Sequence, residues 1–178
     1  MDFQPGIVSG VEHTDVLSHA VTAAQAARAA GIPVVFVRVA FRAGYPEVSA
    51  SNLRFSQIAA GAGDTMTVDH AATQIHADLQ VRENEPVITK KRFSAFAGSD
   101  LEVILRGLDA KHLVLGGVST SGVVLSTLRQ ASDLDYQLTV LADACADHDE
   151  EVHRVLTEKV FAMQAEVTTA DAWAASLA

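Results

Sequence analysis

The sequence predicts a doubly wound α/β fold built on a mostly parallel sheet. Nearly continuous apolar runs that end in polar residues or glycine are typical of parallel strands buried on both faces. Four such runs occur, at 32–41, 85–90, 111–117 and 136–143. Helical patterns accompany them, at roughly 13–30, 99–107, 120–134 and 149–162. This alternation predicts right-handed crossovers between parallel strands.

The ends of the first and last long helices carry local signals. Gly31 followed by Pro33 ends the first helix, and acidic residues at 149–151 occupy the first turn of the last one, as the helix dipole favours. The least regular region, 42–71, is too long for an ordinary connection. It is a candidate lid or partner surface, with a plain surface excursion as the alternative.

Composition limits the class of protein. The 178 residues fit one domain spanning 1–178, and 49% hydrophobic with 20% charged residues indicates a globular chain. The net charge of −9 argues against nucleic-acid and anionic-membrane partners. Neither a membrane-length apolar run nor a signal peptide is seen, so we expect a cytoplasmic protein. The single cysteine, Cys145, excludes an internal disulfide and is expected to be a small buried hydrophobe.

Ligands of such folds sit beyond the carboxyl ends of the strands, so the residues after each apolar run are candidate site residues. The stretch GGVSTSGVVLST at 116–127 is a small, polar strand-to-helix turn, which suits a nucleophile or a bound anion. Lys90 begins a KKR run after the second apolar run, and Asp143 ends the fourth. The opening MDFQPG has the form of the end of a strand whose body is missing.

Four segments, in order, carry a family resemblance: Asp2-Phe3-Gln4, the lysine segment 87–106, the turn segment 116–131 and the strand segment 139–147. Together they cover nearly the whole chain, and they resemble the isochorismatase-like superfamily, also called the cysteine hydrolases. The resemblance implies a three-layer fold with a six-stranded parallel sheet. It also implies a small-molecule substrate and assembly into homodimers or larger homo-oligomers.

The resemblance implies catalytic roles for two residues. Asp2 would be a general acid or base, and Lys90 would lower its pKa or stabilise a developing anion. The alternative for Asp2 is a solvated carboxylate near the terminus. The alternative for the KKR run is a solvated face, which we favour for Lys91 and Arg92.

The chain departs from the family at the nucleophile. The family's cysteine falls on Val123, and a valine cannot attack a carbonyl. Cys145 lies after the next strand and does not replace it. Ser119 and Ser121 are substitute nucleophiles, but neither site segment supplies a histidine base, so we favour helix capping for them.

The resemblance also implies a cis peptide between Val118 and Ser119, in a turn that binds an oxyanion or a carboxylate. The residues of that turn are Val118, Ser119, Thr120, Ser121 and Gly122. A substrate pocket is expected from polar and aromatic residues, with core packing as the alternative for the aromatic ones: Gln4, Arg42, Tyr45, Phe55 and Phe96.

No metal and no other cofactor is expected. The stretch 37–48 lacks the Asp-x-His that metal-binding amidases of the family carry there. Neither His70 with His76 nor His148 with His153 has a spacing that stacks on one helix face.

Three functional hypotheses remain. The first is a hydrolase that uses Asp2 and Lys90 without a cysteine, resembling those isochorismatases that protonate a vinyl ether. The second is a non-catalytic small-molecule-binding or scaffold homologue, favoured if Val123 fills the pocket. The third is a Ser-based amide hydrolase, which needs Ser119 or Ser121 close to Asp2 or Lys90.

A further expectation concerns the first strand. A central strand needs about five or six residues, and only Met1 precedes Asp2. We therefore expect the native protein to begin upstream. Alternatively, the sheet closes up or borrows a strand from another subunit.

Overall fold

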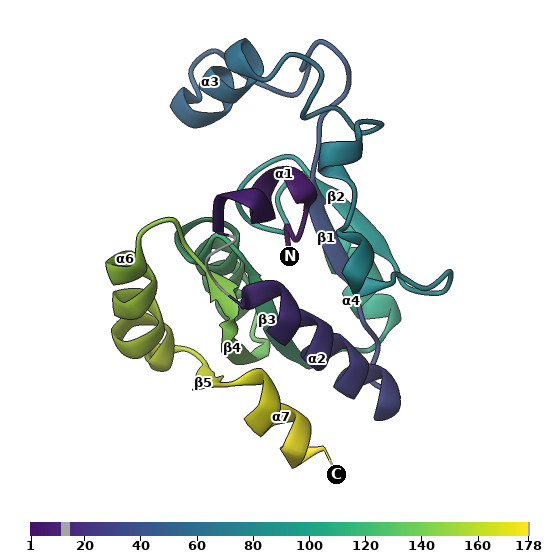
Figure 1. Cartoon of the computed structure of the whole chain (residues 1–178), viewed down its shortest axis with the longest axis vertical. Coiled ribbons are helices and arrows are strands. Elements are labelled where there is room, and N and C mark those ends of the chain that lie inside the picture. Colours follow the sequence, from purple (N-terminus) through teal and green to yellow (C-terminus); the bar gives the residue numbers. More distant parts are fainter. Residues whose placement is uncertain (12–14, 178) are drawn as a thin grey trace.

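Parallel strands alternate with helices along the chain, as the sequence predicts (Figure 1). The structure is a computed structural model that describes residues 1–11 and 15–177. Four strands coincide with the predicted apolar runs, and a fifth, short strand was not predicted. They are β1 (Phe36–Val39), β2 (Val87–Lys90), β3 (His112–Val118), β4 (Gln137–Ala146) and β5 (Glu166–Thr168).

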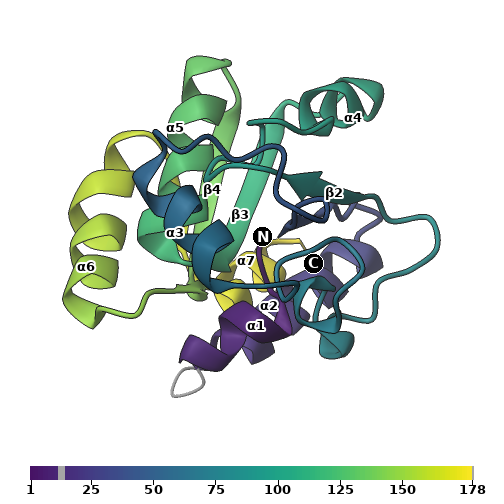
Figure 2. The ribbon, with the colours of Figure 1, turned by 90° about the horizontal axis from the view of Figure 1, so that it is seen from above.

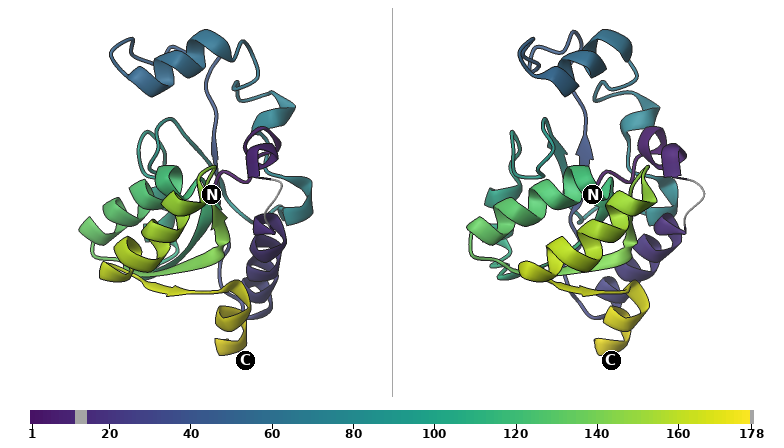
Figure 3. Two further views of the ribbon diagram at one scale, coloured as in Figure 1. Left: turned by 60° about the vertical axis from the view of Figure 1, so that its left-hand side comes forward. Right: turned by 90° about the vertical axis from the view of Figure 1, so that its left-hand side faces the viewer.

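The helices cover both faces of the sheets. In Figure 3, α5 and α6 lie on one face, whereas α2 and α7 lie on the other. The sequence did not predict α1 and α7, and the start of the predicted helix 13–30 lies outside the described residues. The α-helices are α1 (Pro5–Val8), α2 (Val16–Ala29), α3 (Leu53–Gly61), α4 (Leu101–Gly107), α5 (Leu125–Asp133), α6 (Glu150–Val155) and α7 (Ala170–Ser176).

The strands form two separate parallel sheets rather than the six-stranded sheet that we expected. Within the described residues, the orders are β1-β2 and β3-β4-β5, so β1 and β3 are both edge strands. Met1 and Asp2 connect these two edges. The Asp2 amide donates to the Val37 carbonyl (2.7 Å), and the Met1 ammonium donates to the Gly116 carbonyl (2.8 Å). Met1 and Asp2 therefore occupy the position predicted for the end of a central strand.

Close approach of Met1 to β3 depends on Gly117. A Cβ atom at Gly117 would lie 2.7 Å from the Met1 carbonyl oxygen, well inside van der Waals contact. The Val118 amide next to it donates to that same oxygen (3.2 Å). A glycine at this position therefore lets the N-terminal residues lie flat against the end of β3.

Two apolar clusters hold the helices to the sheets. One joins β3 and β4 to α4 and α5, through side chains such as Leu105, Leu115 and Leu128. The other joins the opposite face to α2 and to residues near the N-terminus, such as Phe3 and Ala20. Burial of both strand faces explains why the strands appear in the sequence as continuous apolar runs.

The irregular region 42–71 contains α3, which stands away from the sheets (Figures 1 and 2). A small third cluster anchors it, in which Phe55 packs against Phe41 (ring centroids 5.9 Å apart). The Asn52 side chain accepts from the Phe55 amide and begins the helix. Of the helices that the structure describes, none has both the length and the apolar character needed to cross a membrane.

Candidate active site

Asp2 and Lys90 form a buried ion pair at the carboxyl end of β2. The Lys90 Nζ lies 2.8 Å from the Asp2 Oδ2, and the two side chains are 3% and 6% exposed. Asp2 reaches this position because its amide is bound to Val37 on β1, whose neighbour β2 ends at Lys90. The structure thus brings together the two residues that the sequence predicted as catalytic.

The Asp2 carboxylate is only partly satisfied. Its Oδ1 is buried and has no hydrogen-bond partner among the described residues. Burial raises the pKa of Asp2 above its usual value, and the nearby charge and hydrogen bond of Lys90 oppose that rise without cancelling it. Lys90 lowers this pKa, as we expected, but the desolvation of a nearly fully buried carboxylate is the larger effect, so the net shift is upward. Asp2 also has a positive φ of 57°.

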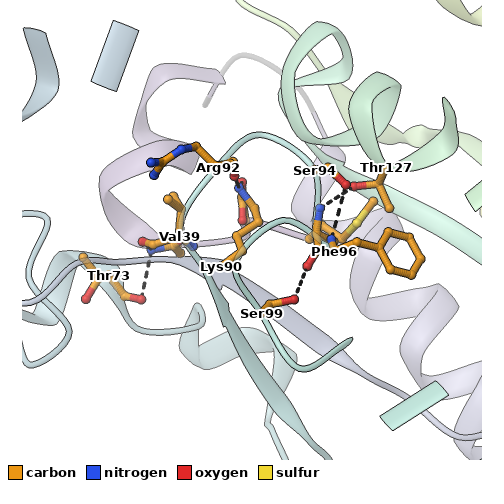
Figure 4. Close-up of polar contacts among 12 residues, drawn as sticks. Val39, Thr73, Lys90, Arg92, Ser94, Phe96, Ser99 and Thr127 are labelled. Carbon is orange, nitrogen blue, oxygen red and sulfur yellow. Dashed lines mark hydrogen bonds and ion pairs between the residues drawn. The ribbon is translucent and has the colours of Figure 1, made fainter. Parts of the chain in front are cut away.

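The loop after β2 fixes Lys90 (Figure 4). The Lys90 ammonium also donates to the Arg92 carbonyl (2.9 Å). The Arg92 guanidinium lies 5.5 Å from the Phe55 ring centroid and donates to the Glu47 carbonyl (2.7 Å). Lys91 donates to the Ala40 carbonyl (2.5 Å). The solvated face that we favoured for Lys91 and Arg92 is therefore wrong: both side chains tie the loop to its neighbours.

The same loop is also bound to α5, a contact that sequence reasoning missed. The Ala95 amide donates to the Thr127 hydroxyl (2.9 Å), and the Ser94 hydroxyl donates to the Gln130 side chain (2.7 Å). Both helix residues lie in the turn-and-helix segment 116–131. The lysine segment and the turn segment are thereby held as one unit.

The turn after β3 has the predicted backbone. The peptide between Val118 and Ser119 is cis, as the family resemblance implied. A short π-helical turn, Thr120–Val124, follows and leads directly into α5. The Ser119 carbonyl accepts from the amides of Gly122 (3.2 Å) and Val124 (3.3 Å). Two of the N–H groups at this helix start are therefore already bound within the turn.

The turn also binds an anion, which comes from the chain itself. The Asp147 Oδ2 accepts from the Ser121 amide (2.7 Å), and Asp147 is buried. The Thr120 hydroxyl is hydrogen-bonded to the Nδ1 of His153 (2.8 Å), and burial lowers the pKa of His153. Asp147 and His153 were not predicted as site residues. The position of Asp147 directly after β4 was a signal that could have identified it as a site residue, because the carboxyl ends of parallel strands meet at one edge of a sheet.

Val123 packs into the core. It is 2% exposed and belongs to the same apolar cluster as Leu115 and Cys145. Cys145 is buried, as expected, and burial raises the pKa of its thiol to about 12, which makes it a poor nucleophile at neutral pH. Neither of the two best-formed cavities of the described chain is lined by Asp2, Lys90 or Val123.

The residues predicted to form a substrate pocket are not gathered in one place. The Gln4 amide group is fully used, because it exchanges two hydrogen bonds with Val39 and donates to the Thr73 carbonyl. Phe96 is buried in the core cluster. Arg42 pairs with Glu47 at the surface, and the Tyr45 hydroxyl donates to the Gly63 carbonyl.

Phe55 packs beside the loop after β2. Its ring centroid lies 5.1 Å from that of Phe93. Within the described residues, no hydrogen bond joins the Ser119 or Ser121 hydroxyl to Asp2 or Lys90, whose ammonium is bound to Asp2 and to the Arg92 carbonyl.

The histidines have structural partners. The rings of His70 and His76 accept hydrogen bonds from nearby amides at the starts of short 3-10 helices. His148 contacts the Gly10 carbonyl at 3.2 Å. Within residues 1–11 and 15–177, no three His, Cys, Asp or Glu side chains are grouped to hold a metal ion.

Comparison with known proteins assigns the class of this α/β fold. The model of the isochorismatase domain matches residues 1–172. An uncharacterized isochorismatase family protein from Escherichia coli O157:H7, YecD, is 33% identical over 157 residues, which cover 86% of this chain and 80% of YecD. The structure of an isochorismatase family protein from Burkholderia thailandensis superposes with a TM-score of 0.85 at 27% identity, covering 99% of this chain and 92% of that one.

The chain belongs to the isochorismatase family. It is also similar to a ureidoacrylate amidohydrolase, RutB, from Pseudomonas savastanoi pv. phaseolicola, with 33% identity over 140 residues. That match covers 68% of this chain and 54% of RutB. Fold and family are therefore shown, and both agree with the resemblance carried by the four sequence segments.

Proposed function

We propose that this protein is a hydrolase of a small molecule that uses Asp2 as a general acid and Lys90 as a fixed positive charge, without a covalent intermediate on cysteine. The buried ion pair with an unpartnered Asp2 Oδ1 carries this proposal. A raised pKa keeps a carboxyl group protonated closer to neutral pH, which is what a general acid requires. The free Oδ1 is the atom from which a proton can leave toward a substrate.

Hydrolysis of a vinyl ether requires a general acid and a fixed positive charge, which Asp2 and Lys90 would supply. Asp2 would transfer its proton to the enol-ether carbon, and water would add to the resulting cation. The carbon–oxygen bond of that adduct then breaks to give an alcohol and a ketone, and the proton lost by the water returns to Asp2. Lys90 holds the carboxylate in place throughout. No step needs a nucleophile at position 123, where the side chain is a valine.

A substrate carboxylate is not expected at the Ser121 amide. Asp147 already occupies that donor, so a bound anion would have to displace a buried carboxylate. This finding moves the anion-binding part of the proposal away from Ser121. Access to Asp2 also requires movement of a covering segment, because Asp2, Lys90 and Val123 are each less than 5% exposed.

One observation favours a second candidate, the non-catalytic homologue. Val123 fills the nucleophile position as part of the core cluster. A protein that had lost its reaction could retain the buried pair simply as structure. The Ser-based amide hydrolase gains no comparable support. Among the described residues, neither the Ser119 hydroxyl nor the Ser121 hydroxyl forms a hydrogen bond with Asp2 or Lys90.

The test is turnover of isochorismate and of a panel of small amides that includes ureidoacrylate. Wild type is compared with Asp2→Asn, and with Lys111→Met as a control at an exposed lysine on the opposite end of β3. We expect turnover that falls about 100-fold or more in Asp2→Asn and is unchanged in the control. Folded wild type without turnover on any member of the panel would favour the non-catalytic homologue. Turnover that survives Asp2→Asn would exclude Asp2 as the acid.

A further inference from the structure

The Lys90 ammonium is held at two points within the described chain. It lies 2.8 Å from the Asp2 Oδ2, and it donates to the Arg92 carbonyl at 2.9 Å. Because lysine carries its charge on a long, flexible stem, contacts of this kind decide where the charge lies. The Arg92 carbonyl is therefore one of the groups that keep the positive charge beside Asp2.

Arg92 belongs to the loop 91–97, which is closed by hydrogen bonds of its own. The Ala97 amide donates to the Ser94 carbonyl (3.2 Å), and the Lys91 amide donates to the Ala97 carbonyl (3.4 Å). A loop that is closed in this way moves as a unit, so a displacement at one point is carried to the Arg92 carbonyl. Whatever anchors this loop also anchors the Lys90 ammonium.

Thr127 anchors the loop to α5 from inside the protein (Figure 4). Its hydroxyl accepts from the Ala95 amide at 2.9 Å, and the two residues are 1% and 0% exposed. The second tie, from the Ser94 hydroxyl to the Gln130 side chain (2.7 Å), involves an exposed residue of the helix. Water can replace a partner at the surface, whereas a buried amide that loses its acceptor keeps the full desolvation cost. We therefore expect Thr127 to be the stronger tie.

The helix that carries Thr127 grows directly out of the turn at 118–124. Thr127 lies in the first turn of α5, four residues beyond Val123, and both side chains are buried. The Ala95–Thr127 hydrogen bond thus sets where the lysine loop lies relative to this helix. It also fixes the charge of Lys90 relative to position 123.

We propose that Thr127 is a positioning residue for Lys90: it holds the loop 91–97 so that the Arg92 carbonyl keeps the Lys90 ammonium against Asp2. Its meaning for catalysis rests on the proposed function, in which Asp2 is the acid and Lys90 the fixed charge. Thr127 acts through the loop and not on the substrate. A valine of the same shape would leave the Ala95 amide buried without an acceptor.

The titration of Asp2 reports on this role without any turnover. Burial raises the pKa of Asp2, and the charges of Lys90 and of the Met1 ammonium lower it. When the Lys90 ammonium is held less closely, its influence weakens and the midpoint of the Asp2 titration moves to higher pH. A residue that only stabilises the fold would leave this midpoint unchanged.

The test compares Thr127→Val with Thr139→Val as the matched control. Thr139 is also buried, near the start of β4, and its hydroxyl is hydrogen-bonded to His112 (2.8 Å). The titration is followed by NMR of isotope-labelled aspartate carboxyl groups, and Asp2→Asn identifies the Asp2 signal by its absence. We expect a midpoint at higher pH in Thr127→Val and an unchanged one in Thr139→Val. No movement in Thr127→Val, or equal movement in both variants, would overturn the proposal.

Thr127→Ser is the rescue variant, because serine keeps the hydroxyl that accepts from the Ala95 amide. Its midpoint should lie close to that of the wild type, and a midpoint as high as in Thr127→Val would rule out the hydroxyl as the anchor. If Thr127→Val does not fold, Thr127→Cys takes its place, since sulfur is a weak acceptor. A folded Thr127→Cys variant with the wild-type midpoint would contradict the proposal.

Turnover separates this inference from the proposed function. If the wild type hydrolyses a member of the substrate panel, Thr127→Val should lower kcat about tenfold or more, because a misplaced catalytic group disturbs the reacting geometry. KM should change by less than about twofold, and Thr127→Ser should restore most of kcat. An equal loss of kcat in Thr139→Val would point to a general structural effect and against positioning. If the wild type has no turnover, the proposed function fails, and the titration still decides whether Thr127 positions Lys90.

Discussion

The Asp2–Lys90 pair and the turn at 118–124 use their polar groups in different ways. At the pair, the Asp2 Oδ1 is buried and has no hydrogen-bond partner among the described residues, and burial raises the pKa of Asp2. At the turn, the Ser121 amide is bound to Asp147, and the amides of Gly122 and Val124 are bound to Ser119. The Asp2 carboxylate therefore lacks a partner for its Oδ1 within the described chain, whereas the turn has partners for the amides of Ser121, Gly122 and Val124.

This difference favours the Asp2–Lys90 pair over the turn at 118–124 as the place where chemistry remains possible. A buried polar atom without a partner costs free energy, and such atoms are concentrated where a ligand or a reaction uses them. The turn binds the Asp147 carboxylate of the same chain and has Val123 in the apolar core, so its contacts are typical of a structural role. The following substitutions test the Asp2–Lys90 pair and the turn, in order of decreasing expected effect.

Lys90→Met should have the largest effect, because it leaves the Asp2 carboxylate buried without its counter-ion. We expect a loss of about 3–5 kcal/mol in the free energy of unfolding at pH 7, measured by urea denaturation. The raised pKa of Asp2 means that the folded state binds a proton more tightly than the unfolded state, so the loss should shrink as the pH falls toward 5.

The control for this substitution is the double variant Asp2→Asn/Lys90→Met, which lacks the buried charge. It should recover part of the stability and show a weaker pH dependence than Lys90→Met alone. A loss below about 1 kcal/mol for Lys90→Met would contradict the buried ion pair.

Asp147→Ala should have an intermediate effect. It leaves the Ser121 amide without its acceptor, and hydrogen bonds to charged groups contribute about 1.5–3 kcal/mol. Thermal or urea unfolding measures this loss. Asp147→Asn is the matched control, because an amide oxygen can still accept, and it should recover much of the loss. Equal losses in both variants would show that the charge, rather than the hydrogen bond, stabilises the turn.

Val123→Cys should change stability least, by less than about 1.5 kcal/mol, since the two side chains are similar in volume. Its informative readout is thiol reactivity, measured by mass spectrometry after labelling with an electrophile at pH 7. A thiol at position 123, in the turn that leads into the N-terminus of α5 and at the same end of the sheet as Lys90, should have a lowered pKa. We expect it to react at least about tenfold faster than Cys145, the internal control whose pKa is raised to about 12. Equal rates would show that the turn no longer supports a nucleophile.

Local patterns explain what the sequence could predict. The apolar runs gave four of the five strands, because strands buried on both faces need apolar side chains at every position. Strand β5 (Glu166–Thr168) escaped because three residues that begin with an exposed glutamate carry no such signal. The proximity of Asp2 and Lys90 agrees with the prediction, which placed both residues at strand ends that meet at one edge of a parallel sheet. Their catalytic roles stay a prediction.

The roles of several other site residues depended on contacts between distant segments. Gln4 looked like a ligand-binding side chain, but its three hydrogen bonds go to Val39 and Thr73, which no local pattern reveals. Asp147 lies 26 residues beyond Ser121, and only the β3–β4 pairing brings it to the turn.

The sequence by itself determined the α/β class and the family, and it predicted that Asp2 and Lys90 lie together, because these depend on the order of residues along the chain. The tertiary structure alone decided the net direction of the Asp2 pKa shift and the use of the Ser121 amide by Asp147. It also decided the division of the strands into two sheets with an apolar cavity between them. The physical reason is that desolvation and backbone pairing depend on which groups surround an atom in space, and spacing along the chain does not specify those neighbours.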